Sequence, residues 1–199
     1  MGASNRFGRS LLVLTAAGVG LVAYGSGARR GQIMLHHLPV VGIGNTSAEF
    51  RAKLVDVAAS LGVNPTWLAA IISFESAGTF SSTIRNGQSG ATGLIQFMPS
   101  TAKRLGTTVD ELAAMTPENQ LDYVGKYFEP WRHRLSTLAD LYMAVLWPRA
   151  IGQPDNYHLF EDGSIQYAQN KGLDVGNKGY VTKGDASRLV AKRIVSSKS

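Results

Sequence analysis

The chain has 199 residues, of which 44% are hydrophobic and 17% are charged, so it is long enough to bury a core of ordinary size. Its formal net charge of +6 favours an acidic partner, such as a cell-wall polymer, an anionic lipid or a nucleic acid, without choosing among them. The absence of cysteine excludes disulfides, a thiolate nucleophile and Cys-type zinc sites, and the four histidines show no HExxH spacing. We therefore expect neither a metal site nor a cofactor.

An uncharged, apolar run lies near the N-terminus. It extends from Leu11 through Tyr24 to Ala28, with arginines on both sides. A run of about 18 residues is just long enough to span a bilayer, but four glycines make it a weak helix former. Three interpretations stay open: a retained membrane anchor, a signal peptide cleaved near Ser26-Gly27-Ala28, and a helix packed into the domain. We assign residues 1–30 to a signal or membrane-anchor segment.

Residues 31–45 contain three glycines and Pro39 but show no helical period, which indicates an extended linker. The domain is expected to cover residues 46–199. Thr46 and Glu49 form a capping-box pair, and apolar residues at helical spacing follow until Gly62 stops the run. These residues are Phe50, Leu54, Val57, Ala58 and Leu61. They predict a core helix that carries no chemistry.

The next helix brings a carboxylate to an apolar surface. Asn64 is a good N-cap and Pro65 suits the first helical position, so a helix is predicted over residues 66–76. Its apolar side is formed by Trp67, Leu68, Ile71 and Ile72. Glu75 falls on the same side, since it follows members of this set by three, four and seven residues. Burial and the negative end of the helix dipole both raise the pKa of such a carboxyl, which is typical of a general acid. The alternative is a surface glutamate at a frayed helix end.

Two sequence blocks around this helix carry a family resemblance. The run from Ala69 to Ser76 (AAIISFES) and the run from Gly90 to Ala102 (GATGLIQFMPSTA) resemble the Glu-Ser and Gly-Leu-Met-Gln-x-Met-Pro-x-Thr-Ala motifs of the soluble lytic transglycosylase family. The resemblance is strongest over residues 47–150 and leaves a C-terminal extension, residues 151–199, outside. It implies an all-α, lysozyme-like fold of about seven helices around a cleft.

The resemblance also implies roles for individual residues. Glu75 is the expected catalytic residue, and the expected substrate-binding residues are Ser76, Gln96, Phe97, Met98 and Tyr142. Gln96 would reach toward the sugar, while Phe97 and Met98 would form the apolar floor of the cleft, with ordinary core positions as the alternative. Tyr142 stands where the family has Tyr-Asn-x-Gly, but only the tyrosine is kept in the run Tyr-Met-Ala-Val. That departure concerns the far wall of the cleft and its sugar preference, and an ordinary core tyrosine is the alternative for Tyr142.

Further helices are predicted after a polar loop at residues 78–90, which would form a flexible rim of the cleft. Pro99 opens the first, and Thr108 with Glu111 caps the second. Another begins at Thr116-Pro117 and ends before Pro130, and the last covers residues 136–147. All of them have apolar positions at helical spacing.

The C-terminal extension is expected to be rich in loops up to Gly163. Residues 174–185 have the outline of an EF-hand loop, but Gly176 and Lys178 stand where the third and fifth ligands belong. This favours a structural turn over a calcium site. Asp185 is then expected to cap a basic helix over residues 186–194, which would present a solvated face or contact acidic wall polymer or lipid.

As a lytic transglycosylase, the protein would cleave the β-1,4 bond between N-acetylmuramic acid (MurNAc) and N-acetylglucosamine (GlcNAc) in peptidoglycan. Glu75 would protonate the leaving oxygen and then accept the proton of the muramic 6-hydroxyl, which closes a 1,6-anhydro ring. A hydrolase would need a second carboxylate about 5–9.5 Å away. No acidic residue lies between Glu75 and Asp110, and Asp110, Glu111 and Glu118 could serve only if the fold returned them to the cleft.

Two alternatives remain. One is a lysozyme-type peptidoglycan hydrolase, and the other is a virion or envelope structural protein that uses the domain as a wall-binding module during phage genome entry. The expected partner is the peptidoglycan glycan strand, and no nucleic acid is required. Membrane association through Leu11 to Tyr24 and contacts with virion or envelope proteins are further expectations. The expected location is the bacterial cell envelope, by export or anchoring, or a phage particle that acts on it.

Overall fold

A computed structural model describes residues 38–195 of the chain. The predicted signal or anchor segment, with its apolar run from Leu11 to Tyr24, lies outside the described residues. Among the helices of residues 38–195, no single one is both long and apolar enough to cross a membrane.

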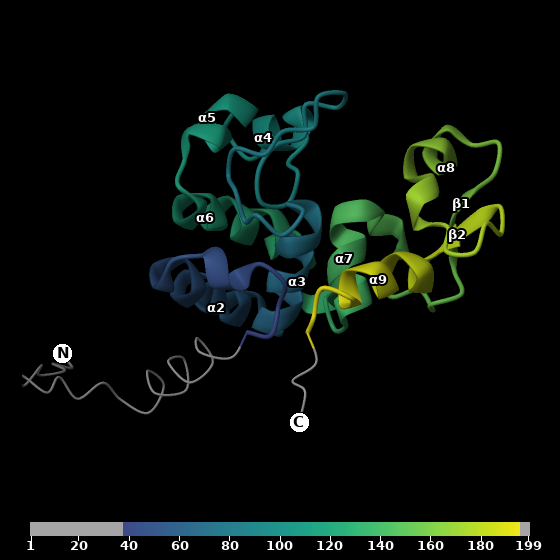
Figure 1. The fold of residues 1–199 in the computed structure, drawn as a ribbon, viewed down its shortest axis with the longest axis horizontal. Coiled ribbons are helices and arrows are strands. Elements are labelled where there is room, and N and C mark those ends of the chain that lie inside the picture. The colour runs from purple at the N-terminus through teal and green to yellow at the C-terminus, as the bar shows by residue number, and fades with distance from the viewer. Residues whose placement is uncertain (1–37, 196–199) are drawn as a thin grey trace, which may run out of the picture.

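Eight α-helices and one two-stranded sheet form the main regular structure of residues 38–195 (Figure 1). In chain order they are α2 (Ala48–Leu61), α3 (Pro65–Glu75), α4 (Pro99–Arg104), α5 (Val109–Ala114), α6 (Pro117–Phe128), α7 (Leu138–Leu146), β1 (His158–Glu161), α8 (Ile165–Asn170), β2 (Tyr180–Thr182) and α9 (Lys183–Ala191). Short 3-10 helices cover Ile43–Asn45, Glu129–Arg134, Pro148–Ala150 and Lys171–Leu173. The prediction of an all-α fold is confirmed, and the small sheet is an addition that the sequence analysis did not foresee.

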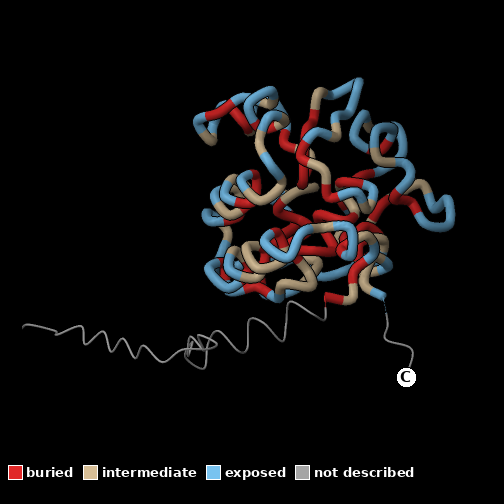
Figure 2. The backbone as a smooth tube through the Cα atoms, turned by 60° about the vertical axis from the view of Figure 1, so that its left-hand side comes forward, coloured by how far each residue is buried: buried red, intermediate tan, exposed pale blue. Residues whose placement is uncertain are grey.

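Helix α3 is the centre of the fold. Asn64 caps it by accepting a hydrogen bond from the backbone N–H of Thr66, and Pro65 occupies its first turn, as predicted. Helices α2 and α6 lie on one side of α3, and α7 and α9 lie on the other (Figure 1). Every residue from 68 to 73 is buried, so α3 is enclosed on all faces rather than along the single apolar side that the sequence indicated. Figure 2 shows buried positions gathered through the middle of the molecule.

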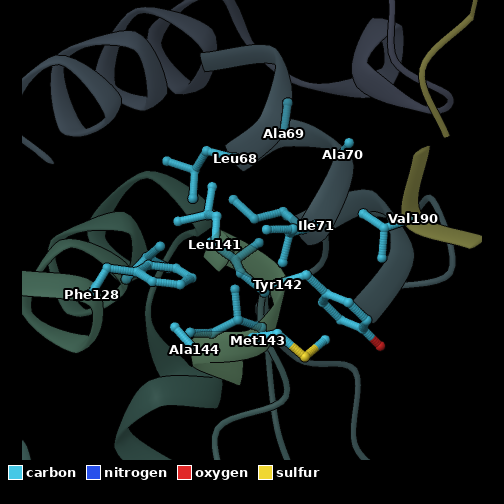
Figure 3. Packing of buried hydrophobic residues seen from close by; sticks show 14 of the residues in the cluster. Leu68, Ala69, Ala70, Ile71, Phe128, Leu141, Tyr142, Met143, Ala144 and Val190 are labelled. Atoms are coloured by element: carbon cyan, nitrogen blue, oxygen red, sulfur yellow. The ribbon is translucent and has the colours of Figure 1, made fainter. Parts of the chain in front are cut away.

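Small side chains allow this enclosure. Ala69 and Ala70 have no exposed surface and let neighbouring elements approach the α3 backbone closely. On another face, Leu68 and Ile71 pack near Leu141 of α7, as Figure 3 shows. A helix enclosed in this way holds its last residue, Glu75, in a fixed position relative to the surrounding helices.

The start of α2 differs from the prediction. Ser47, not Thr46, is the N-cap, because its hydroxyl accepts the backbone N–H of Phe50. The Thr46 hydroxyl instead donates to the carbonyl of Ile43 at 2.7 Å and closes the preceding 3-10 turn. The predicted Thr46–Glu49 capping box is therefore wrong, and the helix is capped one residue later by the Ser47 hydroxyl alone. Gly62 ends the helix in the left-handed region, with φ at +69°.

The helices from α4 to α7 follow the predicted positions within a few residues. Thr108 and Glu111 form the predicted capping box of α5, and the Thr116 hydroxyl caps α6. Helix α7 begins at Leu138, two residues later than predicted, because the Thr137 hydroxyl accepts the N–H of Asp140 and acts as the N-cap.

The end of the predicted linker is packed against the domain. Leu38, Val40 and Ile43 are buried. The N–H of Val41 donates to the carbonyl of Arg193 at 2.9 Å, and the N–H of Val195 donates to the carbonyl of Pro39 at 2.7 Å. The two ends of the described chain therefore lie side by side (Figure 1).

The C-terminal extension shares the core. Strands β1 and β2 pair antiparallel, and α9 packs against α3 and α7. The ammonium of Lys183 lies 2.6 Å from the Asp140 carboxylate, with both side chains buried, so this ion pair joins α9 to α7. Helix α9 starts at Lys183 and not at residue 186, because the Thr182 hydroxyl is its cap and Asp185 is the third residue of a capping box.

The segment with an EF-hand outline forms a hydrogen-bonded turn. The Asp174 carboxylate accepts the backbone N–H groups of Lys178 and Gly179 and the Tyr167 hydroxyl, all within 3.0 Å. The ammonium of Lys178 donates to Asp185 at 2.5 Å. Protein groups thus occupy oxygens that calcium would need.

Candidate functional site

Glu75 is the last residue of α3, and its side chain is partly buried. Burial raises the pKa of this carboxyl from its ordinary 4.5 to about 7. Its carboxyl oxygens have no hydrogen-bond partner among residues 38–195. Every fully buried side-chain polar atom in that range does have a partner, so the Glu75 oxygens are not fully buried. The carboxyl oxygens therefore reach the protein surface from an otherwise desolvating environment. Such a group exchanges a proton readily near neutral pH.

Two tyrosines lie close enough to Glu75 for its negative charge to act on them. Burial is the main cause of the raised pKa of Tyr142 on α7 and of Tyr127 on α6. The charge of Arg104 lowers the pKa of Tyr127, and the charge of Glu75 raises the pKa of both phenols. The pKa of Tyr127 reaches about 12. Both phenols therefore stay protonated at neutral pH and are able to donate hydrogen bonds.

The two phenols differ in what they bind. The Tyr127 hydroxyl donates to the carbonyl of Ala144 at 2.7 Å and so links α6 to α7. The Tyr142 ring packs edge-to-face on Phe74 with centroids 5.6 Å apart, and its hydroxyl points away from the aliphatic core (Figure 3). That hydroxyl has no hydrogen-bond partner among residues 38–195. Since every fully buried side-chain polar atom in that range has a partner, the Tyr142 hydroxyl also reaches the surface.

The sequence did not indicate a role for Tyr127 at the site, although the charge of Glu75 acts on its phenol. The signal that could have drawn attention to it is a hydroxyl on an otherwise apolar helix face, because a buried Tyr hydroxyl needs a partner.

The other expected substrate-binding residues occupy different environments. Ser76 is fully buried, where its hydroxyl donates to the carbonyl of Ile72 and accepts the N–H of Phe80, so it stabilises the end of α3. Phe97 is 1% exposed and packs edge-to-face on Tyr127, which matches the core alternative and not a cleft floor. Met98 is 45% exposed.

Gln96 lies in the irregular segment between α3 and α4. Its backbone is in the left-handed region, with φ at +52°, which is unusual for a residue with a side chain. Its amide donates to the carbonyl of Gly93 at 3.2 Å and makes a longer contact with the carbonyl of Ile84. The structure thus fixes Gln96 through its own loop.

The three acidic residues considered as a second carboxylate are hydrogen-bonded to other groups. Asp110 pairs with Arg85 at 2.6 Å, and the Glu111 carboxylate accepts the Thr107 hydroxyl within the α5 cap. Glu118 accepts the hydroxyl of Ser47. Burial alone accounts for the raised pKa of Glu75. No carboxylate of residues 38–195 contributes to that pKa through its charge.

In a comparison with protein families, the model of the transglycosylase SLT domain matches residues 56–144. This segment of the chain belongs to the transglycosylase SLT family. The expected membership in the lytic transglycosylase, lysozyme-like family is confirmed, and with it a function of the lytic transglycosylase type that acts on peptidoglycan. A search of curated proteins finds no match to the chain.

The matched SLT segment runs from within α2 to within α7. It therefore contains Glu75, Tyr127, Tyr142 and the irregular segment between α3 and α4. The sheet, α8 and α9 lie after it, and α9 nevertheless packs directly on α3.

Proposed function

We propose that this SLT domain protein is a lytic transglycosylase that cleaves the MurNAc-β-1,4-GlcNAc bond, with Glu75 as its single general acid and base. The observation that carries the proposal is the Glu75 carboxyl: partly buried, without a protein partner in residues 38–195, and with its pKa raised to about 7. A carboxyl in this state is protonated often enough to act as an acid and, once ionised, is basic enough to take the proton back.

The reaction has two steps. In the first, Glu75 donates its proton to the glycosidic oxygen, the bond from that oxygen to C1 of MurNAc breaks, and GlcNAc leaves with a new hydroxyl. In the second, the Glu75 carboxylate removes the proton of the muramic 6-hydroxyl while that oxygen bonds to C1. The product is a 1,6-anhydro ring, no water is consumed, and Glu75 ends protonated.

A single carboxylate suffices for this sequence, because the substrate supplies its own nucleophile. A hydrolase would need a second carboxylate to activate water or to attack C1. The engagement of Asp110, Glu111 and Glu118 with other protein groups supports the non-hydrolytic route.

We further propose that the Tyr142 hydroxyl, Gln96 and Met98 contact the glycan beside Glu75. Tyr142 has a free hydroxyl near the carboxyl, and Met98 offers exposed apolar surface to a sugar face. Ser76 and Phe97 are buried and contribute indirectly. Ser76 stabilises the end of α3, and Phe97 packs on the ring of Tyr127. The apolar run from Leu11 to Tyr24 supports action in the cell envelope, where this substrate is found.

Digestion of purified sacculi by the wild type and by Glu75→Gln tests the proposal. Gln keeps the shape of the side chain but has no transferable proton, so turnover should fall by at least about a hundredfold while binding to sacculi survives. Asp122→Asn is the matched control, since it neutralises an exposed carboxylate whose partner is Lys53 of α2, outside the proposed site. Undiminished cleavage by Glu75→Gln, or an equal loss in Asp122→Asn, would contradict the role given to Glu75.

A further inference from the structure

Gln120 joins three segments of the chain through one side-chain amide. It lies in the first turns of α6 and has no exposed surface. Its carbonyl oxygen Oε1 accepts the backbone N–H of Leu94 at 2.7 Å. Its Nε2 donates to the carbonyl of Leu112 at 2.8 Å and to that of Ser82 at 3.2 Å. The amide thus ties both ends of the irregular segment 82–94 to the end of α5.

The segment is shaped to receive this amide. Gly93 has φ at +82°, and a Cβ added there would lie 2.3 Å from Oε1 and 2.6 Å from Nε2 of Gln120. No side chain fits at residue 93 while the Gln120 amide keeps its three hydrogen bonds. Gly93 and Gln120 are therefore a matched pair, although 27 positions separate them in the sequence.

The turn at residues 92–94, which the Gln120 amide holds, is also hydrogen-bonded to Gln96 and Phe97. The carbonyl of Gly93 accepts the side-chain amide of Gln96, and Thr92 exchanges two backbone hydrogen bonds with Phe97 at 2.8 and 3.0 Å. Phe97 in turn packs on Tyr127, a phenol on which the charge of Glu75 acts. A shift of Leu94 or Gly93 would therefore displace Gln96 and Phe97, and through Phe97 the ring of Tyr127.

We propose that Gln120 is a positioning residue, whose amide holds residues 82–97 in the conformation that binds the glycan. The proposal rests on the proposed function, because it assumes that this segment contacts a glycan strand. Only an amide of this length supplies one acceptor and two donors here. An ionised Glu would face two carbonyls without a hydrogen to donate. Met would leave the buried N–H of Leu94 and the carbonyl of Ser82 without a partner, while the carbonyl of Leu112 would keep only the N–H of Met115.

The test compares Gln120→Met and Gly93→Ala with Val124→Ala. Gln120→Met removes the three hydrogen bonds of the side chain while keeping its length nearly constant. Gly93→Ala adds a methyl group that displaces the Gln120 amide, and it tests the same contact if Gln120→Met fails to fold. Val124→Ala is the control, because Val124 is a fully buried apolar residue one turn further along α6. It removes buried apolar volume from the same helix without removing any hydrogen bond of residues 82–97.

Two measurements are made well below the melting temperature. Hydrogen exchange should become about tenfold faster in residues 82–97 of Gln120→Met and of Gly93→Ala, since the Leu94 N–H loses its partner in both variants. The dissociation constant of a tetramer of β-1,4-linked N-acetylglucosamine should rise about tenfold in the same two variants. Both quantities should stay near the wild-type values in Val124→Ala.

Faster exchange with unchanged binding in Gln120→Met and Gly93→Ala would overturn the proposal and leave Gln120 a purely structural residue. Binding that is weakened equally in Val124→Ala would lead to the same conclusion. Unchanged exchange in both Gln120→Met and Gly93→Ala would also overturn the proposal. A wild type that binds the tetramer but does not cleave sacculi would count against the proposed function alone, because neither measurement here depends on cleavage. A wild type that binds no glycan would overturn both.

Discussion

Replacing Glu75 with Gln should stabilise the folded protein at high pH and leave its stability almost unchanged at low pH. In the unfolded chain the carboxyl has its ordinary pKa of 4.5, whereas burial raises the pKa to about 7 in the folded state. Below pH 4.5 both states hold the proton, and the variant has no advantage. Between pH 4.5 and 7 the folded state binds more protons than the unfolded state, so the free energy of unfolding of the wild type falls as pH rises.

The size of the effect follows from the two pKa values. They differ by about 2.5, and each pKa unit corresponds to about 1.4 kcal/mol, so the full cost above pH 7 is about 3 kcal/mol. This is an upper limit, because the carboxyl oxygens keep contact with water. The variant should therefore gain about 1 to 3 kcal/mol over the wild type at pH 8.

Urea unfolding of both proteins at pH 4.5, 6, 7 and 8 measures the difference, in which contributions from all other titrating groups cancel. The difference should grow with pH and level off near pH 8. A difference that stays constant across this range, or a variant that is less stable at pH 8, would show that the Glu75 carboxyl is not desolvated as described.

Three further results are expected. Lys183→Met should lower the free energy of unfolding by about 3 to 5 kcal/mol in urea titrations, because it leaves the buried Asp140 carboxylate without its ion-pair partner; a loss below about 1 kcal/mol would contradict this. Removal of residues 1–30 should leave a domain that unfolds cooperatively and remains active, since the described core begins at Leu38; loss of the cooperative transition in calorimetry would show that these residues pack into it. A calcium chelator should leave the melting temperature unchanged, because Asp174 is already hydrogen-bonded by protein groups; a fall that calcium reverses would contradict the structural turn.

Local signals in the sequence located most of the helices and placed Glu75 at the end of α3. Asn64 and Pro65 mark the start of α3 without help from distant residues, and the spacing along the helix then places Glu75 among buried neighbours. The Thr108 capping box was likewise readable, because both of its partners lie within four residues. At the start of α2 two adjacent hydroxyl residues compete for the same role, and the choice of Ser47 over Thr46 depends on the preceding turn.

Features that depend on distant partners were not predictable in the same way. The pairing of residues 39–41 with residues 193–195 turns the end of an apparent linker into part of the core. The short sheet joins two segments of ordinary loop composition. Gln120 looks like a solvated residue in the first turn of a helix, and only the return of Ser82 and Leu94 to the same point reveals its three hydrogen bonds.

The sequence also overstated the surface roles of Ser76 and Phe97. Motif position suggested contact with the substrate, but packing decides whether a residue next to a catalytic group faces outward or inward. Both residues turn toward the core in the structure.

The most direct test of the central claim is the mass of the products that the wild-type protein releases from purified sacculi. Because the muramic 6-hydroxyl replaces water in the second step, the muropeptides should be about 18 Da lighter than the products of hydrolysis and should lack a reducing muramic end. Muropeptides at the heavier mass, with reducing ends, would contradict a single-carboxylate transglycosylase and would require a second carboxylate beside Glu75.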